Sequence, residues 1–306
     1  MRRWFFLFIV WFTVALSAIA QSSRISFIAK GGMTSYMPYK DLIEPAPLGE
    51  HFGLEGSYTL MWPLPYRNEV GIRFGLHIAY GSPNMRISES FAPYQYTNVD
   101  YLGNQIDYTI HVNRAKQEIQ QFQVGVPIMA AGVSNRIFWS AGFRVMFPFA
   151  LQYEQTLDAD ISAFYPEFGV EVPNELVTGK LNENKHFRGK TTLPKMYLQV
   201  GGEASYRLYY KRPRTIFQPS QAVYLGVFAY FTVASSAMNT NPEDYLVLVK
   251  PIETAPPAEV VVKPLNEVLS PKLMPFEIGL TASFDITYSH RYNSIRHHSR
   301  HILFRP

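Results

Sequence analysis

The chain has 306 residues and a formal net charge of +4; 47% of its residues are hydrophobic, 15% are aromatic and only 17% are charged. Charged residues make up roughly a quarter of an ordinary soluble domain, so the chain is weakly charged for that class. Its mean hydropathy lies slightly below zero. That excludes a bundle of transmembrane helices, each of which needs about 20 mostly apolar residues in a row. The absence of cysteine excludes disulfide scaffolds, thiolate metal sites and cysteine nucleophiles.

The N-terminus has the three parts of a secretory signal. Met1 to Trp4 carries two arginines, Phe5 to Leu16 is almost entirely apolar, and Ala18-Ile19-Ala20 matches a cleavage site. We predict that residues 1–20 are removed on export and that the mature protein lies beyond the inner membrane. The alternative, an uncleaved anchor, is disfavoured by the short apolar region and by the cleavage site.

The C-terminal residues 290–306 are basic, with four Arg, four His and no acid. Loss of the two arginines in the signal lowers the net charge to +2, and setting aside the four tail arginines leaves residues 21–289 at about −2. The basic character therefore belongs to the tail, which we predict to be periplasmic. Nucleic acid is not an expected partner, because no recognisable nucleic-acid-binding element accompanies the charge.

Apolar residues alternate with polar or small ones in eight segments, a period of two that is typical of β-strands. Alternation is clearest from Phe276 to Tyr288. The predicted strands are Ile25–Met33, Phe52–Trp62, Val70–Tyr80, Phe122–Ile128, Ile137–Phe149, Met196–Leu208, Val223–Val233 and Phe276–Tyr288.

The polar face of these strands is rich in Gly, Ser, Thr and Gln and poor in Lys. A soluble β-sandwich or lipocalin-like barrel would instead turn a charged face to water. A small wet interior with an apolar exterior is typical of membrane barrels. We therefore predict an all-β fold in which residues 21–289 form an eight-stranded antiparallel transmembrane β-barrel with long extracellular loops and short periplasmic turns.

The connections between the predicted strands alternate between long and short, as in outer-membrane barrels. Long connections are expected over 34–51, 81–117, 150–195 and 234–275, and short ones over 63–69, 129–136 and 209–222. Asn68, Ser134-Asn135 and Lys211-Arg212-Pro213 supply turn residues in the short ones. Trp62 and Trp139 then lie at the periplasmic ends of their strands, where interfacial aromatic residues gather.

Over 25–288 the chain resembles the small outer-membrane β-barrel proteins of Gram-negative bacteria, the group related to the OmpA membrane domain and OmpX, and its Tyr-rich strands and long loops resemble the Bacteroidota versions. Glu277-x-Gly279-x-x-Ala282-x-Phe284 resembles their assembly signal, although here about 18 residues follow Tyr288. The resemblance implies an outer-membrane location and contact with outer-membrane lipid, lipopolysaccharide and the barrel assembly machinery.

The region 251–275 is rich in proline but has strand-like segments on both sides. It is predicted to be an extracellular loop in which 245–252 and 258–265 could pair as a hairpin. If that hairpin entered the membrane the barrel would have ten strands. Val260-Val261-Val262 lacks alternation, which favours eight. The 17 residues after 289 are too few for a second, peptidoglycan-binding domain.

The alternation places charged residues on the inner face of the predicted barrel. Four are basic, Lys30, Arg73, Arg144 and Arg207, and four are acidic, Glu55, Glu203, Glu277 and Asp285. An eight-stranded barrel is narrow enough to be filled by side chains, and confined charges are tolerated only when paired. We interpret these eight as a salt-bridged plug; a gate or ion path is the alternative.

No catalytic arrangement is evident. There is no G-x-S-x-G, His77 faces the predicted lumen, and His51, His111 and His186 lie in predicted loops. His297, His298 and His301 have neither carboxylate nor cysteine nearby, so no metal or cofactor is predicted. The expected function is that of a non-enzymatic structural or surface-interaction barrel. The alternatives are a subunit of an envelope secretion machine of the PorT-like kind, with partners reached through loops or tail, or, less favoured, a lipid-modifying enzyme or a narrow pore.

Overall fold

The computed structural model describes the parts of the chain that carry the fold. These are residues 22–37, 43–44, 47–64, 68–87, 93–100, 102–172, 185–213, 218–236, 246–249, 260–269 and 274–289. The predicted signal peptide and the basic tail lie outside them.

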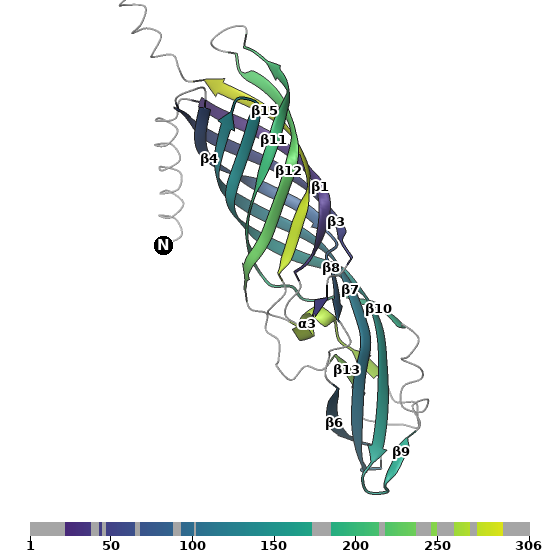
Figure 1. The fold of residues 1–306 in the computed structure, drawn as a ribbon. Coiled ribbons are helices and arrows are strands. Elements are labelled where there is room, and N and C mark those ends of the chain that lie inside the picture. The colour runs from purple at the N-terminus through teal and green to yellow at the C-terminus, as the bar shows by residue number, and fades with distance from the viewer. Residues whose placement is uncertain are drawn as a thin grey trace, which may run out of the picture.

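Eight antiparallel strands pair in a closed cycle, which we call the strand ring (Figure 1). They are β1 (Ser22–Tyr36), β3 (Gly49–Leu64), β4 (Asn68–Gly81), β7 (Gln105–Ser134), β8 (Ile137–Tyr165), β11 (Tyr197–Lys211), β12 (Ser220–Ser235) and β15 (Pro275–Ser289). Each of the eight predicted segments falls in a different one of these strands, apart from Met196, which immediately precedes β11. The last strand pairs with the first, Ser22 lying opposite Ser289. The all-β, antiparallel prediction is confirmed.

The short connections lie together at one end of the ring, which we call the short-turn end. The tightest joins β7 to β8 through Asn135 and Arg136, and Asn135 has a positive φ of 54°. Two-residue hairpin turns require a positive φ, and asparagine tolerates that conformation better than most residues. Trp62 lies opposite Val70, and Trp139 lies opposite Gly132, near this same end.

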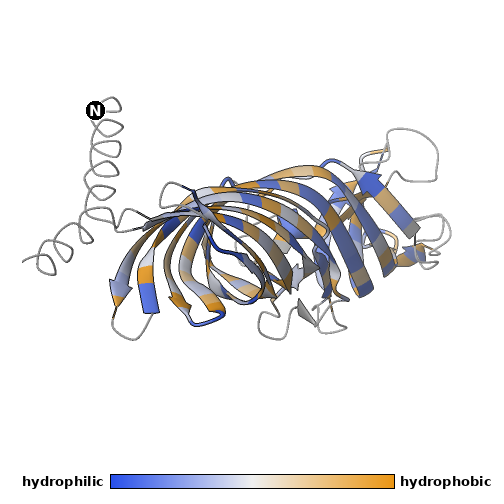
Figure 2. Cartoon of the chain, turned by 90° about the horizontal axis from the view of Figure 1, so that it is seen from above, coloured by the Kyte–Doolittle hydropathy of each residue, from blue (hydrophilic) through white to orange (hydrophobic). Residues whose placement is uncertain are grey.

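Side chains alternate between the interior and the exterior of the ring along every strand. On β1, Lys30 is buried while Phe27 and Met33 are exposed, and on β11 Glu203 is buried while Val200 is exposed. Figure 2 shows the same alternation as orange and blue bands along the strands. These buried and exposed positions agree with the predicted phases on β1 and β11.

The predicted count of eight strands is wrong for the sheet as a whole: in the part of the chain that the structure describes, this sheet has thirteen strands, and a separate sheet has two. Closure is uneven because β7 and β8 continue as a pair beyond the ring (Figure 1). We call this region the distal extension: Gln105–Gln120 of β7, Gln152–Tyr165 of β8 and the short strands that pair with them. Those strands are β5 (Asn84–Ile87), β6 (Tyr94–Val99), β9 (Val170–Val172) and β10 (Lys185–Gly189), with β2 (Ile43–Glu44) added beside β5.

Much of the sequence predicted to form long loops is therefore β-sheet with its own apolar core. Ile110, Val112, Leu157 and Ile161 are buried in it. The predicted hairpin exists: β13 (Val247–Val249) pairs with β14 (Val260–Val262) as the separate sheet and adds no strand to the ring. Its strands pack on the same core.

The helix α3 (Leu265–Leu269) lies where the ring meets the distal extension (Figure 1). Gln117 of β7 exchanges hydrogen bonds with Asn266, donating to its side chain and accepting from its backbone, each at 2.8 Å. Gln155 of β8 accepts from the Leu265 backbone at 2.9 Å. None of the described helices is long and apolar enough to cross a membrane.

Candidate functional site inside the strand ring

The interior of the ring holds charged side chains supplied by β1, β3, β4, β8, β11 and β15. Each occupies an inward position because the period of two repeats through the strand. The buried members are Arg24, Lys30, Glu55, Arg73, Arg144, Glu203, Glu277 and Asp285. Seven of these eight are among the eight charges predicted to face the lumen.

Four of them form a compact quartet. Lys30 Nζ lies 2.7 Å from Glu55 Oε2 and 2.5 Å from Glu203 Oε1. Arg73 pairs with Glu203, Nη1 to Oε2, at 2.8 Å and also contacts Glu55. Each cation therefore contacts both anions, so the quartet is electrically balanced. Such pairing offsets the several kcal/mol that each buried ion loses on leaving water.

A second group surrounds Arg144. Its guanidinium pairs with Glu277, donates from Nε to Gln199 Oε1 at 2.6 Å and lies 3.7 Å from the centre of the Tyr230 ring. His51 Nε2 lies 3.6 Å from the Glu277 carboxylate. His51 was predicted to lie in a loop; it is instead a buried, inward residue of β3, because that strand begins earlier than its alternation indicates.

Two residues connect the groups. Tyr230 donates its hydroxyl to Glu203 at 2.8 Å while its ring contacts Arg144. His77 lies between Glu55, at 3.7 Å, and Arg144, at 3.5 Å. The quartet and the Arg144 group thus form one continuous network across the ring.

The prediction for Arg207 differs from what the structure shows. Among the described residues Arg207 has no ion pair, and its guanidinium lies 4.8 Å from the centre of the Tyr210 ring at the short-turn end. The partner of Asp285 is Arg24, at 3.2 Å. Arg24 went unrecognised because the alternation at the start of β1 is irregular: Ser22, Ser23 and Arg24 are all buried.

An apolar layer separates the Arg24–Asp285 pair from the quartet. Phe138 lies between two guanidiniums, with Arg24 at 4.8 Å and Arg73 at 6.0 Å from its ring centre. Tyr224 packs beside it at 6.0 Å. Met61 and Val133 complete the layer. Side chains therefore fill the cross-section of the ring, as expected for eight strands.

The interior carboxylates differ from those of a general acid–base site. The carboxylates are neutralised by cations, whereas a general acid or base must be free to exchange a proton with substrate. His111 of β7 and His186 of β10 are exposed, and both lie outside the interior network; His186 Nδ1 is 3.3 Å from the Thr156 hydroxyl oxygen. Among the described residues no cluster of His, Asp and Glu is arranged to hold a metal ion.

The four residues of the assembly motif divide between the two faces of β15. Glu277 and Gly279 point inward, whereas Ala282 and Phe284 point outward. A Cβ on Gly279 would lie 2.3 Å from the Gly31 carbonyl oxygen, so the close approach of β1 leaves no room for a side chain there. Glu277 and Gly279 thus have structural roles in addition to the predicted role in assembly.

Comparison with protein-family models and with curated proteins finds no match to this chain.

Proposed function

We propose that the chain is a non-enzymatic integral protein of the bacterial outer membrane. Its strand ring spans the bilayer with a closed lumen, and its distal extension acts outside the cell as a structural or surface-interaction element. The single observation that carries the proposal is an inversion of polarity along β7 and β8.

On β7 the outward side chains change from polar to apolar at one level. Lys116, Glu118 and Gln120 point outward in the distal extension; Phe122, Val126 and Ile128 do so in the ring. Inward side chains change from apolar to polar at the same level: Ile119 in the extension is followed by Gln121 and Gln123 in the ring. The extension is thus polar outside and apolar inside, as in water, whereas the ring is apolar outside and polar inside.

The inversion on β8 occurs at the same level. Leu151 ends a run of apolar outward residues, and Gln152, Glu154 and Thr156 follow it. Gln152 donates to Gln120 across the two strands at 2.8 Å, beside a bulge that separates ring from extension. A boundary between water and the bilayer interior at this level explains the polarity changes on both β7 and β8. On β7 the apolar outward stretch from Phe122 to Gly132 covers about 11 residues, which matches the 9 to 11 that a tilted strand needs to cross a bilayer.

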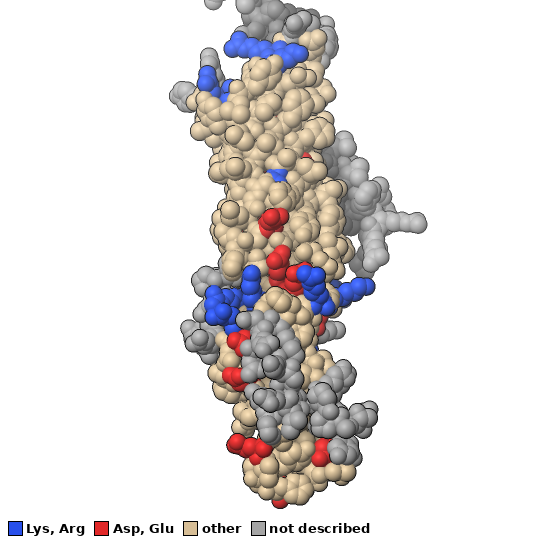
Figure 3. Space-filling view, turned by 90° about the vertical axis from the view of Figure 1, so that its right-hand side faces the viewer, with Lys and Arg blue, Asp and Glu red and all other residues tan. Residues whose placement is uncertain are grey.

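The apolar exterior extends around the ring. Every ring strand contributes an exposed large apolar side chain, namely Phe27, Leu54, Leu76, Val126, Phe143, Val200, Val227 and Leu280. Leu54 and Leu280 are 63% and 62% exposed. The largest apolar patch on a soluble monomer is roughly 300–600 Å², whereas this surface encircles the molecule. On the face in Figure 3 the ring carries few charges between a group of Lys and Arg at its upper end and mixed charges where the extension begins.

The ion-paired interior and the apolar layer favour a plug over a pore. Opening a path would separate pairs such as Lys30–Glu55 in a setting of low polarity. The distal extension, by contrast, is a rigid sheet with its own core, a scaffold suited to presenting loops to partners.

Measuring the membrane topology tests the proposal. Because the chain has no cysteine, single introduced cysteines can be labelled without background. Single cysteines at Ser162, exposed on the distal extension, and at Asn135, in the β7–β8 turn, are treated with a membrane-impermeant maleimide on intact cells. We expect Ser162→Cys to be labelled, and Asn135→Cys only after the outer membrane is permeabilised. Equal labelling of the two, or recovery of the protein in the soluble periplasm, would overturn the proposal.

A subunit of an envelope secretion machine is the second candidate. The observation that favours it is a basic cavity at the short-turn end, which on this topology faces the periplasm. Crosslinking in intact cells separates the candidates: a defined set of envelope proteins attached through the short-turn end supports a subunit, and contacts confined to the distal extension support a surface protein.

A further inference from the structure

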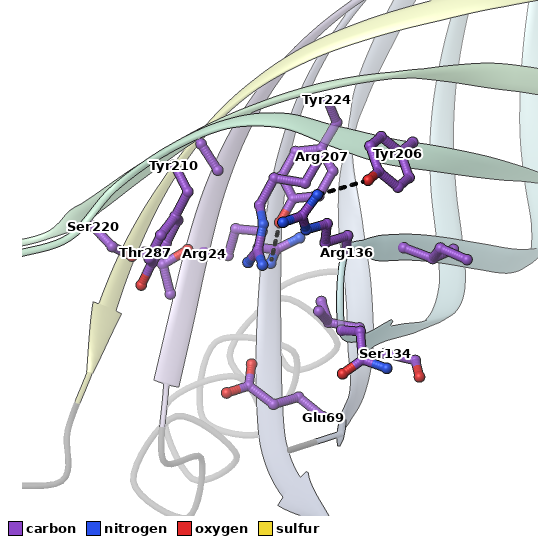
Figure 4. A pocket seen from close by; sticks show the side chains of 14 residues that line it. Arg24, Glu69, Ser134, Arg136, Tyr206, Arg207, Tyr210, Ser220, Tyr224 and Thr287 are labelled. Atoms are coloured by element: carbon purple, nitrogen blue, oxygen red, sulfur yellow. Dashed lines mark hydrogen bonds between the residues drawn. The ribbon is translucent and has the colours of Figure 1, made fainter. Parts of the chain in front are cut away.

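A cavity of about 720 Å³ opens at the short-turn end of the ring (Figure 4). Three guanidinium groups, from Arg24 on β1, Arg136 in the β7–β8 turn and Arg207 on β11, line it together with the aromatic residues Tyr206, Tyr210 and Tyr224. Glu69 is the one acid in its described lining and lies across the opening from the guanidiniums (Figure 4).

Neutral aromatic groups hold these arginines in place. Arg136 donates to the Tyr206 hydroxyl at 3.0 Å, Arg24 donates to the Tyr224 hydroxyl at 3.4 Å, and Arg207 stacks on Tyr210. Of these three arginines, only Arg24 forms an ion pair with a described residue, Asp285. Arg136 and Arg207 are therefore positioned without a counterion from any described residue.

The cavity has a closed floor. Arg24 lies over Phe138 and Tyr224, and Phe138 separates it from Arg73 of the interior quartet. An ion entering from this end meets the apolar layer and not a passage. The arginines thus form a blind, positively charged pocket, which is suited to holding a ligand.

We propose that this cavity binds a carboxylate-rich segment of a partner protein. Guanidinium groups bind carboxylates with two parallel hydrogen bonds, and the stacked tyrosines add apolar contact with an extended chain. The recessed position favours a peptide over the flat surface of a membrane, because Arg24 and Arg207 lie within the mouth of the ring. Beside the cavity, β15 ends at Ser289, and the basic residues 290–306 follow. The basic composition of these residues favours an acidic partner over the tail itself as the occupant.

The test measures binding of a fluorescent hexaglutamate peptide to the purified full-length chain in nonionic detergent, by fluorescence anisotropy. Arg136→Gln and Arg207→Gln each remove one charge from the cavity. Arg188→Gln, on β10 at 75% side-chain exposure, removes the same charge far from it and is the matched control. Arg24 is left unchanged because its loss would strand Asp285.

We expect each cavity variant to bind hexaglutamate roughly 10-fold more weakly or worse, and Arg188→Gln to stay within about two-fold of the parent. Affinities that are equal in all four proteins would overturn the proposal, because binding would then reside elsewhere, including the tail. Displacement of the peptide by glycerol 3-phosphate at an equal concentration would also overturn it and indicate a lipid headgroup. The measurement uses purified protein, so its outcome is separate from that of the topology experiment.

Discussion

The interior ion pairs make a strong prediction about Arg144. Its side chain is fully buried and contacts Glu277, Gln199 and Tyr230. In Arg144→Ala, the polar contacts that Glu277 keeps among the described residues are Gln199, at 3.3 Å, and His51, at 3.6 Å. A buried carboxylate is then left without its main counterion.

Removing one partner of a buried pair costs about 3–5 kcal/mol. A free-energy change of 1 kcal/mol shifts the Tm of a protein of 150–250 residues by roughly 2–4 °C, so the expected loss in Tm is about 6–20 °C. The further change Glu277→Gln removes the stranded charge, and we expect it to restore part of the loss, with a coupling energy of roughly 0.5–3 kcal/mol.

The assay is heat-dependent migration on a detergent gel, in which the folded ring migrates apart from the unfolded chain. Arg188→Ala is the control, because its pair with Glu154 is exposed and such pairs contribute only about 0–1 kcal/mol. If Arg144→Ala lost no more stability than Arg188→Ala, or if Glu277→Gln restored nothing in its background, the interior pairs would not stabilise the ring as argued.

Three further predictions concern the faces of β15 and the distal extension. Phe284→Asp, on the outer face, should cost up to roughly 2 kcal/mol of stability and reduce the folded fraction recovered from membranes. Thr281→Asp, at the position opposite Lys30 in the β1–β15 ladder, should cost less. The reverse order would mean that the two faces are misassigned. Leu157→Ala should destabilise the distal core by about 2–5 kcal/mol and increase its proteolysis while leaving the ring resistant to detergent; simultaneous loss of both would show that they unfold as one unit. Hydrogen bonds from Thr97, at 2.7 Å, and from Gln105 hold the pKa of Asp107 below its ordinary value. Any stability that the Asp107 carboxylate adds to the β6–β7 pairing is therefore lost as pH falls through that lowered pKa. Thr97→Val should raise the pKa of Asp107 in an NMR titration.

The sequence predicts the ring well because one physical rule governs it. A strand with different media on its two faces must alternate, and the phase of that alternation identifies Lys30, Arg73 and Glu203 as inward. The β7–β8 turn follows from Asn135. Both features are local, so the sequence alone reveals them.

The distal extension escaped prediction for a reason that is also physical. On β7 the apolar face of the extension points inward, so the apolar positions Ala115 and Ile119 are out of phase with Phe122 to Ile128, and a bulge near Asn113 shifts the register again. Predicting β7 by a single phase therefore ends it where the polarity of its two faces inverts and leaves the remainder as a loop. Arg24 escaped for a different reason: it precedes the predicted first strand, because the alternation is irregular where Ser22, Ser23 and Arg24 are all buried.

The polarity inversion on β7 is the central claim, and cysteine accessibility along that strand tests it most directly. Single cysteines at Lys116, Glu118, Val124 and Val126 are exposed to a water-soluble maleimide in isolated outer membranes. Labelling should be fast at Lys116→Cys and Glu118→Cys and should fall sharply at Val124→Cys and Val126→Cys, since these outward positions lie on the ring side of the boundary. Labelling of Val124→Cys and Val126→Cys as fast as that of Lys116→Cys would mean that the ring exterior faces water and would contradict the membrane-spanning account.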